Sequence, residues 1–205
     1  MEKLSRLPVI QKAGEEGDIS GYDLSGIDLR DLEFIAVNFR GCNLRKAYLS
    51  SANFIGANFT NAHLENADLT FSSFMGANFT VAHLGGADLT NSRISLARFE
   101  RADLSGSNLQ MTEAVLLQAR EANLHKTKAY RASMIGADFS GADMRGTMLH
   151  GADLSGAKLS SADLRDSSLI ETVLIAADLT SADMRGAVQR GIDTKRARLS
   201  GIKTD

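Results

Sequence analysis

The chain has 205 residues, a formal net charge of −2 and a single cysteine, Cys42. One cysteine excludes an internal disulfide framework and any multi-cysteine metal site, and a near-neutral charge is not typical of a general nucleic-acid binder. No apolar run approaches the roughly 18 residues of a membrane span, and the charged N-terminus does not resemble a secretory signal. We therefore expect a cytoplasmic protein with room for one domain or one short solenoid.

Residues 1–16 precede a repeat that occupies most of the chain. Leu4, Leu7, Val9 and Ile10 are interspersed with charged residues, which predicts a short helix or turn. We expect this segment to be an N-terminal cap, because the open end of a repeat array exposes apolar residues and unpaired backbone edges.

From residue 17 onward, a large apolar residue recurs at every fifth position. Leu, Phe, Met or Ile occupies 32 of the 37 such positions between Ile19 and Leu199. A small residue, most often alanine, lies two residues earlier, and Asp or Asn often lies between them, as in Ala67-Asp68-Leu69. Glycine is frequent two residues after the large residue, where it can supply the positive φ of a type II turn.

A period of five fits neither a helix nor a straight strand. In an α-helix, five residues advance the side chain by about 140° beyond a full turn, so the large residues would spiral around the helix. In a strand, an odd period would place successive large residues on opposite faces. The chain must therefore turn once in every repeat.

A longer period of 20 residues sets the number of turns in one coil. Phe59, Phe79 and Phe99 are 20 residues apart, and Ala62-His63-Leu64 recurs as Ala82-His83-Leu84. We therefore predict that four repeats form one coil. Its lumen is lined on each side by one large and one small side chain. Alanine is needed because the four large side chains already fill so narrow a lumen.

This A-(D/N)-(L/F)-x-x signature resembles the pentapeptide-repeat family over roughly residues 17–187. The resemblance implies an all-β fold, a right-handed quadrilateral β-helix, and the chain length predicts about nine coils of 20 residues. The handedness follows from the resemblance and not from the spacing.

Residues 188–205 are expected to form an irregular C-terminal cap or loose tail. Gln189 and Thr194 occupy positions of the large residue there, so the regular tube is predicted to stop near Ala187. This tail carries a net charge of +3, and residues 1–33 carry a net charge of −4. Opposite charges at the two ends suggest head-to-tail association, with two independently solvated caps as the alternative.

One stretch, residues 111–131, departs from the pattern. Ala114, Ala119 and Ala129 occupy its large positions, and Leu117 occupies a small one. The preserved phase favours a distorted coil, and a helical excursion is the alternative. Its outward side chains are either a partner-binding patch or the solvated surface of a strained coil. The candidate partner-binding residues are Arg120, His125, Lys126, Lys128, Tyr130 and Arg131.

A second candidate surface is an acidic face formed by one column of outward residues. Its candidate residues are Asp23, Asp103, Asp143, Asp163 and Asp183. Arginines follow the last three of these residues, which predicts surface ion pairs of small individual value. His63 and His83 belong to the same column and could ligate a metal with Glu65, but incidental surface histidines are the simpler interpretation, and we predict no metal and no cofactor.

No catalytic motif is evident, and the aspartates lie on a convex wall without a cleft. We therefore predict a non-enzymatic scaffold that binds a protein partner, without direct contact to nucleic acid or membrane. The family resemblance implies an alternative, a dimeric DNA mimic that binds DNA gyrase or topoisomerase IV and protects it from quinolones or related toxins. The small net charge and the arginines beside the acidic column weigh against this alternative. A homodimer or end-to-end association is compatible with both.

Overall fold

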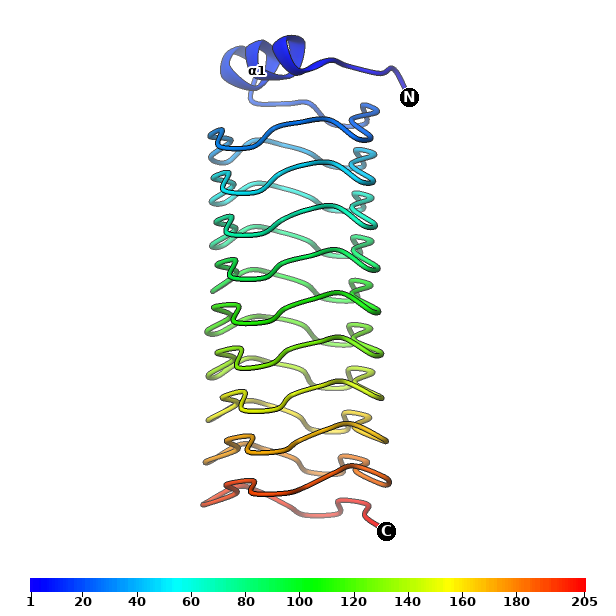
Figure 1. Ribbon diagram of the computed structural model, residues 1–205, viewed down its shortest axis with the longest axis vertical. Coiled ribbons are helices and arrows are strands. Elements are labelled where there is room, and N and C mark those ends of the chain that lie inside the picture. The colour runs from blue at the N-terminus through cyan, green and yellow to red at the C-terminus, as the bar shows by residue number, and fades with distance from the viewer.

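The computed structural model describes all residues, 1–205, as one stack of coils with a single helix at its N-terminal end (Figure 1). That helix, α1 (Arg6–Glu15), is followed by coils without extended strands. Each repeat instead contributes one isolated bridge, and the bridges are parallel and join residues 20 apart, such as Asn58 with Asn78. One coil therefore contains four repeats, as the sequence period predicts.

Backbone hydrogen bonds run along the axis from coil to coil. The amide of Leu64 donates to the carbonyl of His83 at 2.7 Å, and the amide of His83 donates to the carbonyl of Ala62 at 2.9 Å. The same pair of bonds recurs on each side of the coil, and bridged strands of this kind lie about 4.8 Å apart. The right-handed sense of winding and the total of about nine coils stay predictions.

The chain turns in every repeat through a residue with positive φ. Within residues 44–47, the last amide donates to the first carbonyl at 3.0 Å, and Lys46 has a φ of 56°. Positive φ confined to the third residue is the type II geometry. It recurs at every fifth position from Gly21 to Gly201, and 22 of these residues are not glycine. The turn thus accepts residues other than glycine, even the β-branched Val81, more often than we expected from the frequency of glycine at this position.

The lumen is filled by side chains that stack along the axis. Phe59 stacks on Phe79 with ring centroids 4.8 Å apart, and Phe74 meets Phe79 edge-on at 5.3 Å. Each such aromatic pair contributes about 0.5–1.5 kcal/mol beyond the burial of its area. Between these rings the small position is fully buried, as at Ala77, so the two kinds of position together close the lumen.

Several small polar residues in the lumen are accommodated by a hydrogen bond to a main-chain carbonyl, whereas the buried hydroxyls of Ser92, Ser107 and Ser167 have no partner. The Cys42 thiol donates to the carbonyl of Ile19 at 2.9 Å, and the Thr127 hydroxyl donates to the carbonyl of Leu104 at 2.8 Å. Burial raises the pKa of the Cys42 thiol to about 11, so the thiol stays protonated and fills space.

Helix α1 lies across the N-terminal end of the stack (Figure 1). Its Val9 is fully buried and belongs to the same apolar cluster as the lumen. Tyr22, Ile27 and Leu32, which occupy the small position in the first coils, pack against this cluster. These larger side chains fit because the first coil meets a helix and not another coil.

The coil pattern continues past Ala187, where the sequence predicts that it stops. Asp183 still bridges Lys203, although the interior positions of this last stretch are exposed or half-buried. Axial hydrogen bonds use main-chain groups, so Gln189 and Thr194 do not interrupt them. The expected irregular tail is therefore corrected to a regular coil with a poorly filled lumen.

Residues 111–131 also form an ordinary coil, and neither a distortion nor a helix is found there. Leu117 is 2% exposed, and Ala114 and Ala119 are fully buried. Large and small side chains have exchanged positions at Leu117 and Ala119, which conserves the volume of that repeat, while Thr112 and Thr127 occupy the small positions beside Ala114 and Ala129. The backbone consequently needs no adjustment.

We expect Ala77→Leu to lower the free energy of unfolding by about 1–3 kcal/mol, because the added carbons have no space in the lumen. Chemical denaturation followed by circular dichroism measures this change. Ala176→Leu is the matched control, since Ala176 is an exposed turn residue and the longer side chain meets solvent there. Equal effects of the two substitutions would contradict a filled lumen.

Candidate functional site

The predicted acidic residues lie in one outward column of the stack. Parallel bridges join each member of this column to the equivalent residue of the next coil. The column comprises Asp23, Asn43, His63, His83, Asp103, Asn123, Asp143, Asp163 and Asp183. It therefore offers at most one carboxylate per coil of about 4.8 Å, whereas duplex DNA carries one charge per about 1.7 Å.

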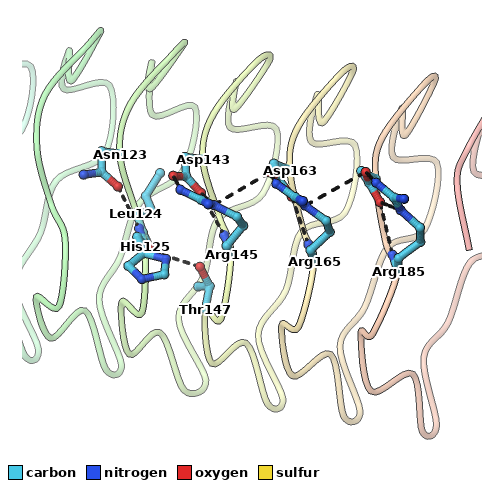
Figure 2. A network of polar contacts seen from close by, with 10 residues as sticks. Asn123, Leu124, His125, Asp143, Arg145, Thr147, Asp163, Arg165 and Arg185 are labelled. Atoms are coloured by element: carbon cyan, nitrogen blue, oxygen red, sulfur yellow. Dashed lines mark hydrogen bonds and ion pairs between the residues drawn. The ribbon is translucent and has the colours of Figure 1, made fainter.

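Arginines neutralise the last three aspartates of the column (Figure 2). The Arg165 guanidinium binds Asp163 through two contacts, Nη2 to Oδ2 at 2.6 Å and Nε to Oδ1 at 2.8 Å. Its Nε also lies 4.0 Å from Oδ2 of Asp183 on the next coil. The same bidentate pairing occurs one coil earlier and one coil later, so this end of the acidic face carries balanced charge.

The pairing stabilises the ionised form of each carboxyl group. Hydrogen bonds from Arg185 lower the pKa of Asp183 to about 2. Side-chain hydrogen bonds from Arg165 are the main cause that lowers the pKa of Asp163. Carboxylates that stay ionised around neutral pH are poorly matched to general acid–base catalysis.

Aspartate and asparagine side chains elsewhere support the turns of the coil. Asp68 Oδ1 accepts a hydrogen bond from the Thr70 amide at 3.1 Å and from its hydroxyl at 2.7 Å. Asn58 makes the same two contacts with Thr60. Such Asx interactions fix the backbone where it changes direction, and they give the Asp or Asn of the repeat a structural role.

The structure does not bring the six candidate partner-binding residues together. Five of them are divided among three consecutive turns, residues 119–122, 124–127 and 129–132. Consecutive turns lie at different corners because the chain changes direction in every repeat. In chain order, these turns carry Arg120, then His125 and Lys126, then Tyr130 and Arg131, with Lys128 on the side between the last two turns.

Arg120 is held in an ion pair at its own corner. Its Nε lies 2.7 Å from Oδ2 of Asp138, whose side chain is 2% exposed, and Lys158 Nζ lies 3.5 Å from the same oxygen. Burial raises the pKa of Asp138, but hydrogen bonds from Ser140 and Arg120 outweigh it and lower the pKa overall. This cluster was missed in the sequence, although residues 18 apart face each other across neighbouring coils.

Tyr130 and Arg131 lie at one corner, and Lys128 lies on the adjoining side, among residues of the neighbouring coils. The Tyr130 hydroxyl lies 2.6 Å from the sulfur of Met148, which is the bridge partner of Lys128. An open pocket of about 370 Å³ is lined by Gln110, Met111, Tyr130, Arg131 and His150. We call these pocket residues, with Lys128 and Met148, the Tyr130 surface. The other members of this surface could have been identified from the coil period, because each lies 20 residues from Lys128, Tyr130 or Arg131.

The His63, Glu65 and His83 side chains do converge, with potential ligand atoms within 4.8 Å of one another. The two rings are stacked in parallel with centroids 4.7 Å apart. Arg45 Nη2 contacts Nδ1 of His63 at 2.8 Å and Oε1 of Glu65 at 2.9 Å. A guanidinium thus already supplies the positive charge at this cluster, which disfavours a metal there.

The chain is similar to known repeat proteins. A family model described as Pentapeptide repeats matches with 8 copies over residues 33–70, 42–80, 72–110, 120–156 and 157–188. No curated protein matches the chain. The helix α1 is not long and apolar enough to cross a membrane.

Two solved structures resemble the protein over nearly its whole length. HetL, a pentapeptide repeat protein of the cyanobacterium Nostoc sp. strain PCC 7120 involved in heterocyst differentiation regulation, is 26% identical with a TM-score of 0.52, covering 97% of this chain and 96% of HetL. QnrB1, a plasmid-mediated fluoroquinolone resistance protein, is 21% identical with a TM-score of 0.68, covering 92% of this chain and 91% of that one. The likeness to QnrB1 is one of fold alone. The family match over most of the chain, with the stacked coils of four repeats, shows that this protein belongs to the pentapeptide repeat family.

Proposed function

We propose that the protein is a non-catalytic scaffold that binds a protein partner at the Tyr130 surface. The observation that carries this proposal is the composition of that surface. Tyr130 and Arg131 lie beside Met111 and Met148, which are 48% and 36% exposed. Tyr, Arg and Met are enriched at the centres of protein interfaces, where tyrosine and arginine often dominate the binding energy.

A binding role, and not a catalytic one, is supported by how the polar side chains are used. Most aspartates of the outer surface take part in turns or ion pairs, such as that of Asp163 with Arg165. The pocket beside Tyr130 is open, its lining contains no carboxylate, and the Glu171 carboxylate that contacts His150 lies outside the lining. The likeness to HetL, which is involved in a regulatory process, also supports a binding role.

The charge of the Tyr130 surface indicates the kind of partner. Lys128 and Arg131 flank the apolar centre, and His150 Nε2 lies 3.5 Å from a carboxylate oxygen of Glu171. A partner with an acidic rim around an apolar centre would complement this arrangement.

A second candidate function is that of a DNA mimic that binds DNA gyrase or topoisomerase IV and protects it from quinolones or related toxins. The fold shared with QnrB1 and the column from Asp23 to Asp183 support it. The arginine pairing of the last three aspartates opposes it, because a mimic of the phosphate backbone needs unbalanced negative charge.

We expect the double substitution Tyr130→Ala/Arg131→Glu to weaken binding of the partner by about tenfold or more, because both central side chains are lost. Affinity capture of partners from the source cells, quantified by mass spectrometry, measures the change. Arg101→Glu is the matched control, because Arg101 occupies the same positive-φ turn position as Arg131 at another corner. A partner retained equally by all variants would place binding elsewhere.

For the second candidate, we expect the wild-type protein to leave gyrase supercoiling unchanged with or without a quinolone. Replacing Arg145, Arg165 and Arg185 by serine removes the positive charges that pair with the neighbouring aspartates. If charge balance prevents mimicry, this variant should inhibit gyrase supercoiling more strongly than the wild-type protein. Protection of gyrase by the wild-type protein would establish the second candidate against the first.

A further inference from the structure

One of the four corners of the stack is apolar along most of its length. The central residues of its turns, which we call the apolar corner, are 35–36, 55–56, 75–76, 95–96, 115–116, 135–136, 155–156 and 175–176. None of these residues is charged, and Ile, Met, Val or Leu occurs in every turn except 155–156. Each of the other three corners carries several charged side chains.

The large apolar side chains of this corner follow one another from coil to coil: five are exposed, and those of Met75, Val115 and Ile175 are half-buried. Ile35, Leu96 and Leu116 are 55%, 56% and 48% exposed. Seven coil steps separate the first and last turns, so the row is about 34 Å long. Arg93 and Arg98 are among the polar residues that flank it on its two sides. An apolar strip with a polar rim is the arrangement of a protein interface.

The two ends of the apolar corner carry opposite charges. At the N-terminal end, Glu33 lies beside Ile35 and lines an open pocket of about 470 Å³, whose other walls are mostly apolar and include Ile10 of α1. At the C-terminal end, the same corner carries the exposed side chains of Lys195 and Arg196. Apolar walls with one carboxylate suit the aliphatic stem and charged head of a lysine or arginine.

We propose that the apolar corner binds the apolar corner of a second copy of this chain in antiparallel orientation. The antiparallel orientation brings the Lys195–Arg196 end of each copy to the Glu33 pocket of the other. A parallel orientation would instead place like charges against each other at both ends.

The order of side chains along the corner is compatible with a two-fold axis at Val115 and Leu116. About this axis, Leu96 of one copy faces Ile135 of the other, and Ile55 faces Ile175, because each pair is equally distant from 115–116 in the chain. A two-fold interface is self-complementary, so every contact occurs twice. The turn with two large apolar residues, Val115 and Leu116, then meets its own copy at the axis.

A second copy also matches the spacing of the row. Two identical stacks share the coil repeat of about 4.8 Å, so each turn of one copy can face a turn of the other along the whole row. A contact roughly 34 Å long and 10 Å wide buries on the order of 700 Å² in total, which is below the size of a standard stable interface. We therefore expect a reversible dimer with a dissociation constant on the order of micromolar.

Sedimentation velocity over a concentration series tests the dimer. The wild-type protein should pass from monomer to dimer, and Leu116→Glu should weaken association about tenfold or more, because two carboxylates meet at the axis. Met111→Glu is the matched control, since Met111 is also 48% exposed at a positive-φ turn position but lies on another corner. Thermal unfolding checks that both variants fold. A monomer at every concentration, or equal weakening by both substitutions, would overturn the proposal.

Cysteine cross-linking tests the orientation in a Cys42→Ala background. Leu116→Cys, at the axis, should give a disulfide-linked dimer under mild oxidation. Leu96→Cys alone should not, whereas Leu96→Cys combined with Ile135→Cys should. Efficient cross-linking of Leu96→Cys alone would show parallel pairing and overturn the antiparallel register. Because the Tyr130 surface lies on another corner, loss of the dimer and loss of partner binding are distinguishable.

Discussion

Main-chain hydrogen bonds between neighbouring coils are the interaction on which the rest of the structure depends. They join residues 19 and 21 apart, as in the pair made by His83 with Leu64 and Ala62, so each coil must contain the same number of residues as the next. This constraint explains why no insertion interrupts the repeat. It also explains why the coil persists through residues 111–131 and to Lys203, where the side chains depart from the pattern.

The period of the repeat and the period of the coil were sufficient to predict the winding, its lumen and the aspartate–arginine ladder. These features follow from spacing alone, since every fifth residue faces inward and every twentieth shares a column. The backbone at residues 111–131 was not predicted correctly because the exchange of Leu117 and Ala119 was taken as a distortion, whereas the lumen requires only a conserved volume. The proposed patch around Arg120 was divided for a related reason, because neighbours in the chain are separated by the next turn.

Functional information in such a fold lies in columns and corners and not in clefts. The axial hydrogen bonds are made by the main chain and the lumen is filled by inward side chains, so many different side chains are found at the outward turn positions. One column of aspartates is neutralised by Arg145, Arg165 and Arg185, one corner gathers Tyr130 with methionines, and one corner stays apolar. The charged ladder, the proposed partner surface and the proposed self-association surface therefore occupy different parts of one rod.

The winding of four repeats per coil is tested most directly by cross-linking across neighbouring coils in a Cys42→Ala background. Glu113 and Ser133 are bridge partners on adjacent coils, and bridged residues lie within the distance that a disulfide spans. Glu113→Cys combined with Ser133→Cys should form an intramolecular disulfide, detected by mass spectrometry of the digested monomer. Glu113→Cys combined with Lys128→Cys should not, because Lys128 lies one repeat short of a full coil from Glu113. Cross-linking of the second pair without the first would contradict the account.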